Sequence, residues 1–143
     1  MKREYLVQEL WSRLAAISGV QTTARNPKQP PKEGEFPRIN IFDLEESVDE
    51  AQAFRSQKLS FSLLVEFFVE ASSEQAGTKE LMAFADSVVG AMYQTGLKLA
   101  RQGHLGVIVE QKRSRVLRPP VGGPVFGLGI WFEIRYVEDL PTT

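Results

Sequence analysis

A run of alternating side chains dominates the middle of the chain, at residues 58–71. Every second residue from Leu59 to Val69 is apolar, whereas the positions between them carry serine, glutamate, leucine and phenylalanine. This period of two indicates a β-strand with one fully buried face. At about 3.4 Å per residue the strand would extend for roughly 45 Å, whereas ordinary strands have about 5–6 residues. The sequence therefore predicts a strand that is longer than the core of a small protein requires.

The same alternation returns near the end of the chain, from Phe126 to Tyr136, and predicts a second long strand that ends at about Glu138. Two shorter strands are expected, one at residues 38–44 behind a proline and one that begins at Leu105. The acidic segment at residues 43–50 is expected to end the first of these shorter strands.

Apolar residues at helical spacing predict one helix at residues 2–18 and another from Ser72 to about Arg101. The four prolines of residues 21–37 favour a loop there, and residues 112–124 are expected to form a second extended loop. The order is then α-β-β-α-β-β, in one domain over residues 1–143. We expect an α+β fold, a two-layer α/β sandwich with a mainly antiparallel four-stranded sheet and two helices on one face.

The composition offers few catalytic groups. The chain has no cysteine, one histidine and a formal net charge of −1, so thiolate chemistry and cysteine metal sites are excluded. The histidine, His104, lies in a glycine-flanked turn, and a hydrolase that uses it is a minor alternative. No apolar run approaches the roughly 20 residues of a membrane span. We expect no enzyme activity, no cofactor, no metal and no membrane association.

Charged and aromatic residues give the candidate interaction surfaces. The expected topology places an acidic turn and a basic turn at opposite ends of the sheet, which suits head-to-tail contact between copies or contact with two partners. The alternative is that both turns are simply solvated, and the basic turn also suits contact with nucleic-acid phosphates. The sheet face away from the helices mixes apolar and charged residues, which fits cover by another subunit or by the loop at residues 21–37. The candidate residues are Asp43, Glu45, Glu46, Asp49 and Glu50 (acidic), Lys112, Arg113, Arg115 and Arg118 (basic), and Phe68, Trp131 and Arg135 (sheet face).

Three segments resemble the lambda-type tail terminators of phages. They are Phe36-Pro-Arg-Ile-Asn-Ile-Phe42, the long strand with Val65-Glu-Phe-Phe-Val69, and the closing Gly129-Ile-Trp-Phe-Glu-Ile-Arg-Tyr-Val-Glu138. The resemblance implies a ring, a hexamer in that family, at the head-proximal end of the tail tube. Such a ring stops tube polymerisation and provides the surface that joins the head. It also implies a virion location after assembly in the host cytoplasm, contacts with the tail tube protein and a head-completion or neck protein, and DNA passing through the lumen.

Two other functions remain open from the sequence. One is another neck, head–tail joining or tail-completion protein, of a long flexible or a contractile tail. The other is a monomeric ferredoxin-like domain that holds a small ligand or RNA on its open sheet face. In that case Phe68 and Trp131 are the expected stacking residues.

Overall fold

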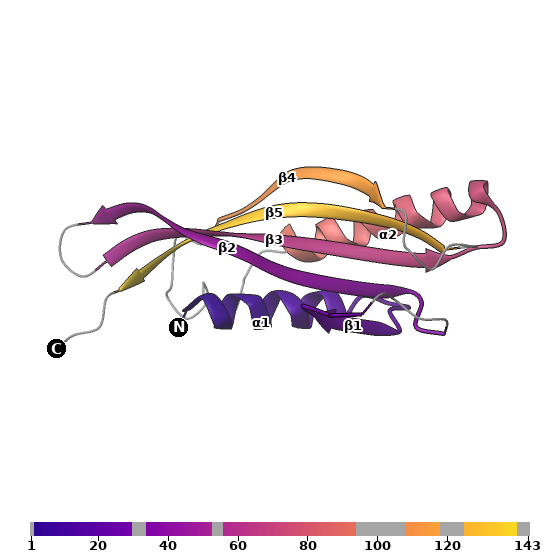
Figure 1. The fold of residues 1–143 in the computed structure, drawn as a ribbon, viewed down its shortest axis with the longest axis horizontal. Helices are drawn as coiled ribbons and strands as arrows, with labels where there is room; N and C mark the ends of the chain where they lie inside the picture. The colour runs from indigo at the N-terminus through magenta and orange to yellow at the C-terminus, as the bar shows by residue number, and fades with distance from the viewer. Residues whose placement is uncertain (1, 30–33, 53–55, 94–107, 118–124, 140–143) are drawn as a thin grey trace.

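The structure, a computed structural model, describes residues 2–29, 34–52, 56–93, 108–117 and 125–139 (Figure 1). Within these ranges the chain forms two helices and five strands, so the expected α+β class is confirmed. The order is α-β-β-β-α-β-β, with one strand more than predicted. The elements are α1 (Lys2–Ala15), β1 (Thr22–Arg25), β2 (Arg38–Gln52), β3 (Ser56–Glu70), α2 (Glu74–Tyr93), β4 (Ile108–Leu117) and β5 (Val125–Asp139).

The sheet of the described residues has five strands in the order β1-β2-β3-β5-β4, which corrects the expected four-stranded sheet. β1 pairs in parallel with the start of β2, and the other three pairings are antiparallel. The additional strand lies inside residues 21–37, for which the prolines predict a loop. Its four residues are too few and too polar to produce an alternation signal, and its partner is supplied by tertiary structure.

The charged segments do not interrupt strands, which corrects two further predictions. β2 continues through the acidic segment to Gln52, with register irregularities between Asp43 and Glu46 and between Val48 and Glu50. The basic residues up to Leu117 belong to β4 and not to a loop. β4 is the last strand of the described sheet, and β2 beyond the part covered by β1 has no described strand on one side, so neither segment needs the apolar alternation of a central strand.

The core lies between the two helices and one face of the sheet. α1 contacts α2, β1 and β2, whereas α2 packs on β3 and β5. The apolar face of β3, from Leu59 to Val69, is buried in this core together with the alternate residues of β5 from Leu128 to Tyr136. The three long strands run side by side and extend at one end past both helices and β4 (Figure 1). Strands longer than the core requires are therefore a feature of the folded chain.

Two glycines of α2 give a matched stability test. A Cβ at Gly77 would lie 2.7 Å from Phe126 Cγ and overlap that ring, whereas a Cβ at Gly90 would meet no atom within 4 Å. Gly77→Ala should therefore destabilise the protein by about 1–3 kcal/mol through overpacking, despite alanine's better helix propensity. Gly90→Ala should stabilise it by about 0.5–1 kcal/mol. Urea unfolding of both variants measures this, and a stabilising Gly77→Ala would contradict the packing described.

Candidate interaction surface

The outer face of the sheet, meaning the side of β2, β3, β5 and β4 that points away from the helices, carries a row of large side chains. The strand register aligns Phe42, Leu64, Trp131 and Arg113 across the four strands. The three apolar residues are half-buried. The Arg113 guanidinium carbon lies 4.3 Å from the centroid of the Trp131 ring, which is a cation–π contact. Two of the predicted candidates are thus brought together, with the arginine covering part of the tryptophan.

Phe68 lies in a parallel row of the same face, next to Gly127 of β5. A Cβ at Gly127 would lie 2.7 Å from Phe68 Cδ1, so the phenylalanine ring occupies the space that a side chain at this position would need. Phe68 is consequently only 4% exposed. Little of its surface is therefore accessible in the single chain.

Arg38, opposite Phe68, and the pair of Asn40 and Glu66, which lies between the two rows, form a polar group that the sequence did not suggest. The buried Arg38 donates a hydrogen bond from Nε to Asn40 Oδ1 at 2.7 Å and forms an ion pair with Glu35. Asn40 stands opposite Glu66 on β3. Burial raises the pKa of Glu66, and the hydrogen bond from Asn40 partly offsets this effect. The centre of the outer face is therefore a hydrogen-bonded polar strip beside an apolar row.

Lys112 and Arg135, two predicted interface residues, are balanced by acids of the same chain. Arg135 Nη2 lies 3.0 Å from Glu110 Oε2, and Arg135 Nε lies 2.9 Å from Glu133 Oε1. Lys112 Nζ lies 3.2 Å from Glu110 and 3.3 Å from Glu133. The hydrogen bond to Glu110 is the main cause of a raised pKa of Lys112, and the hydrogen bond to Glu133 adds to it. The four charges neutralise one another, which leaves little net charge at this point for a partner.

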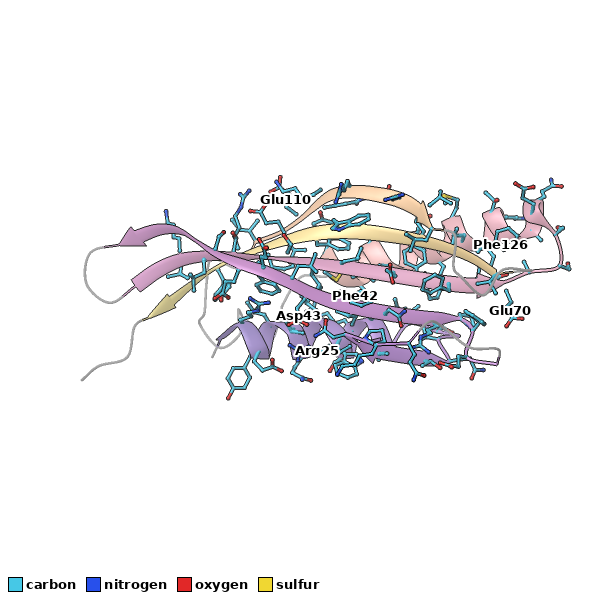
Figure 2. The ribbon with its side chains drawn as sticks, in the orientation of Figure 1. Arg25, Phe42, Asp43, Glu70, Glu110 and Phe126 are labelled. Carbon is cyan, nitrogen blue, oxygen red and sulfur yellow. The ribbon has the colours of Figure 1, made fainter. Side chains whose placement is uncertain are left out.

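Asp43 of the acidic segment is engaged within the chain. Arg25 of β1 donates to it from Nε at 3.1 Å and from Nη2 at 3.0 Å, and Arg3 of α1 lies 3.6 Å away. Figure 2 places Arg25 directly beside Asp43, with Glu110 far across the sheet on β4. The hydrogen bonds from Arg25 lower the pKa of Asp43 to about 2. Asp43 therefore ties β2 to β1 and α1.

Glu46 also faces the helix side of the sheet. It accepts a hydrogen bond from the Tyr136 hydroxyl and lies 3.5 Å from Arg3. Two carboxylates of the acidic segment, Asp43 and Glu46, therefore make contacts within the chain. The sequence offered one signal for this: five carboxylates within eight residues need cations nearby, and Arg3 and Arg25 provide them.

The remaining candidates that the structure describes belong to β2 and β4. Glu45 is exposed on β2, and Arg115 is exposed on β4. Asp49 and Glu50 belong to β2, but their side chains are not described, and Arg118 lies outside the described residues. Beside β4, a hollow of about 530 Å³ separates the strand from α2 and is lined by Asp86, Arg115 and other residues of both elements.

The acid-dependence of stability should report on Asp43. Its folded-state pKa of about 2 lies below the ordinary 3.8, so its contribution is complete above about pH 4 and is lost as the pH falls towards 2. Asp43→Asn should lower the free energy of unfolding by about 1–2 kcal/mol at pH 6. At pH 2.5, just above the folded-state pKa, the difference between the variant and the native protein should be clearly smaller. Urea titrations at both pH values measure this, and a difference that does not change with pH would contradict it.

The described residues contain no cluster of three or more histidine, aspartate or glutamate side chains that could hold a metal ion. No helix in the described part of the chain is long and apolar enough to cross a membrane. His104, the residue on which the hydrolase alternative depends, lies outside the described ranges.

Comparison of the sequence with models of known protein families finds no match, and comparison with curated proteins finds none either. The fold does resemble solved structures. One of them is a chain from the virion of a native gene transfer agent particle, with a TM-score of 0.56 and 16% sequence identity. The likeness covers 92% of this chain and 91% of that chain. The two chains therefore share a fold over nearly their whole lengths.

Proposed function

We propose that this chain is a structural protein of a phage-type particle, and that it acts as a tail terminator. In this role it forms a ring, of six copies as in the terminator family, on the head-proximal end of the tail tube. It stops tube growth and offers the surface to which the head-completion or neck protein binds. The location follows from the role: the virion tail or neck, after assembly in the host cytoplasm. No catalytic step is proposed.

The observation that carries the proposal is the full-length fold likeness to a chain of a gene transfer agent virion. It stands beside the independent resemblance of three sequence segments to tail terminators. The architecture adds support, because strands that extend past the helices leave part of the sheet without helix cover, which a neighbouring subunit can supply (Figure 1). Arg115 and the half-buried outer face also leave room for a non-specific contact with DNA that passes through the ring.

A neck or head–tail joining role is the nearest alternative, since the fold likeness to a virion chain supports it equally well. The monomeric ligand- or RNA-binding alternative has less support. Of its two expected stacking residues, Phe68 is packed on Gly127, and Trp131 is partly covered by Arg113. A base would have to displace the arginine to reach the tryptophan.

Tube assembly tests the proposal. The tube protein of the same particle, polymerised alone, should grow without a defined length. Addition of this chain should bound the length and place a ring at one tube end in negative-stain images. Incorporation into particles with unchanged tube length would favour the neck role. A monomer that binds oligoribonucleotides and loses that binding on Trp131→Ala would favour the RNA-binding domain.

A further inference from the structure

Two edges of the sheet are open in the described residues. β4 is the last strand on one side, and on the other side β1 covers β2 only from Arg38 to Ile41. The Asn26 side chain extends this cover by one step, since it donates to Asp43 Oδ1 at 2.8 Å and accepts from the Asp43 backbone N–H at 3.3 Å. The Leu44 carbonyl accepts a hydrogen bond from Arg3 Nη2 at 2.7 Å, and from Glu45 to Gln52 no described strand pairs with β2 on its outer side. Open strand edges carry unpaired N–H and C=O groups and pair with other chains unless something prevents it.

The two open edges carry opposite charges. The β2 edge, residues 45–52, contains four acidic residues and no basic residue. On the β4 edge, residues 108–117, three basic residues outnumber the single acid Glu110. Contact between two β2 edges or between two β4 edges would bring like charges together, and such contact is unfavourable. Only the pairing of a β2 edge with a β4 edge brings opposite charges together.

We propose that the β2 edge of one copy pairs with the β4 edge of the next copy, so that the sheet continues from subunit to subunit. Within the chain, three successive antiparallel pairings make β4 run opposite to β2. If copies are related by rotation about an axis from which the strands tilt, as in a closed sheet, the junction is antiparallel as well. The two edges are different surfaces, so the interface is heterologous and closes into a ring when the rotation allows it.

The register fixes how the copies must be displaced. Through β5, Arg115 is level with Glu66 on β3. Glu45 has no paired residue on β3 and lies between the positions of Leu63 and Phe61. The two charges are therefore offset by about four residues, or ~13 Å along the strands. Neighbouring copies joined at these charges are shifted by this distance, as in closed sheets whose strands tilt by about 35–45° from the axis.

Charge reversal tests the junction with two exposed residues. Neither Glu45 nor Arg115 has a side-chain ion pair or hydrogen bond among the residues that the structure describes. Glu45→Arg and Arg115→Glu should each weaken self-association at least about tenfold, because like charges then meet at every junction. The native melting temperature should be retained, which separates weakened association from misfolding. Sedimentation velocity across protein concentrations measures the effect.

An equimolar mixture of the Glu45→Arg and Arg115→Glu variants should recover association. When copies of the two variants alternate, the introduced arginine meets the introduced glutamate at one junction, and the native charges meet at the next. The recovery is specific to a heterologous junction. Glu80→Arg, an exposed substitution on α2, is the matched control and should associate like the native protein.

Disulfide trapping gives an independent test, because the chain has no cysteine. Glu45→Cys combined with Arg115→Cys cannot close within one chain. β3 and β5 separate the two edges, at about 4.8 Å per strand, whereas a disulfide needs Cα atoms within about 7 Å. Oxidation should therefore yield a ladder of covalent oligomers on a non-reducing gel. The double variant Glu45→Cys and Thr78→Cys is the control. Thr78 is an exposed residue of α2, away from both edges, so oxidation of this variant should give no ladder.

The edge junction rests on the proposed ring and deepens it, yet the two fail separately. A chain that stays monomeric at every concentration and gives no ladder, or reversal variants that associate like the native protein, would overturn the edge junction. Bounded tube lengths with such variants would still leave the terminator role standing. Edge-joined oligomers that leave tube length unchanged would overturn the terminator role and support the junction.

Discussion

Phe61→Ala is expected to lower the free energy of unfolding by about 3–5 kcal/mol, the largest effect of any single change considered. Phe61 is 1% exposed on the core face of β3. Its ring meets Tyr136 edge-on with centroids 6.0 Å apart, and the Arg3 guanidinium lies 4.8 Å from its centroid. Truncation would leave a cavity where α1 covers the long strands. The melting temperature should fall by roughly 10 °C, at about 2–4 °C per kcal/mol for a chain of this size.

Tyr5→Ala is the matched control for this prediction. Tyr5 is an aromatic residue on the exposed side of α1, with 65% of its surface accessible. Its truncation should change the free energy of unfolding by no more than about 0.5 kcal/mol. Calorimetry or urea unfolding of both variants measures the contrast. Similar losses for Phe61→Ala and Tyr5→Ala would mean that α1 does not cover this part of the sheet as described.

Arg25→Ala is expected to cost about 2–3 kcal/mol, the second-largest effect. Arg25 forms two paired contacts, with Asp43 Oδ1 and Oδ2 at 3.1 and 3.0 Å, and with Glu4 Oε2 and Oε1 at 2.6 and 2.9 Å. Its removal would leave the part-buried carboxylate of Asp43 without its main donor. The arginine also connects β1 to α1 and β2, so β1 should detach more readily.

Hydrogen exchange distinguishes this local effect from a general loss of stability. The amides of Thr23 to Arg25 should exchange faster in the Arg25→Ala variant than global unfolding accounts for. Lys28→Ala removes an exposed positive charge three residues further on and should change stability by no more than about 0.5 kcal/mol. Equal stability losses in the two variants would contradict the role of Arg25 in holding β1.

The division of the acidic segment has a consequence for mutagenesis of the proposed ring. Asp43 and Glu46 stabilise the fold through Arg3, Arg25 and Tyr136, so their substitution would weaken assembly indirectly. Glu45 has no such contact within the described residues. It is therefore the acidic residue whose reversal reports on subunit contact alone.

The sequence by itself determined the long strands and the helices that cover them. The alternation from Leu59 to Val69 requires a strand with one buried face, because no helix places every second residue on one side. The spacing of Leu6, Leu10 and Leu14 likewise requires a helix, and all three are fully buried. Both patterns are local. Each repeats often enough to distinguish the strand period of two residues from the helix period of 3.6 residues. The absence of cysteine also followed directly from the sequence.

Only the tertiary structure decided the edges of the sheet. The strand Thr22–Arg25 has no pattern of its own and exists because the start of β2 supplies its partner. The charges of the acidic and basic segments indicate strand ends, yet both segments continue as strands because each lies at an open edge of the described sheet, where its charges are exposed or ion-paired. The partners of Asp43, from α1 and β1, are distant in the sequence and come together only on folding. Pairing between segments far apart depends on what surrounds each strand, and no window of sequence contains that information.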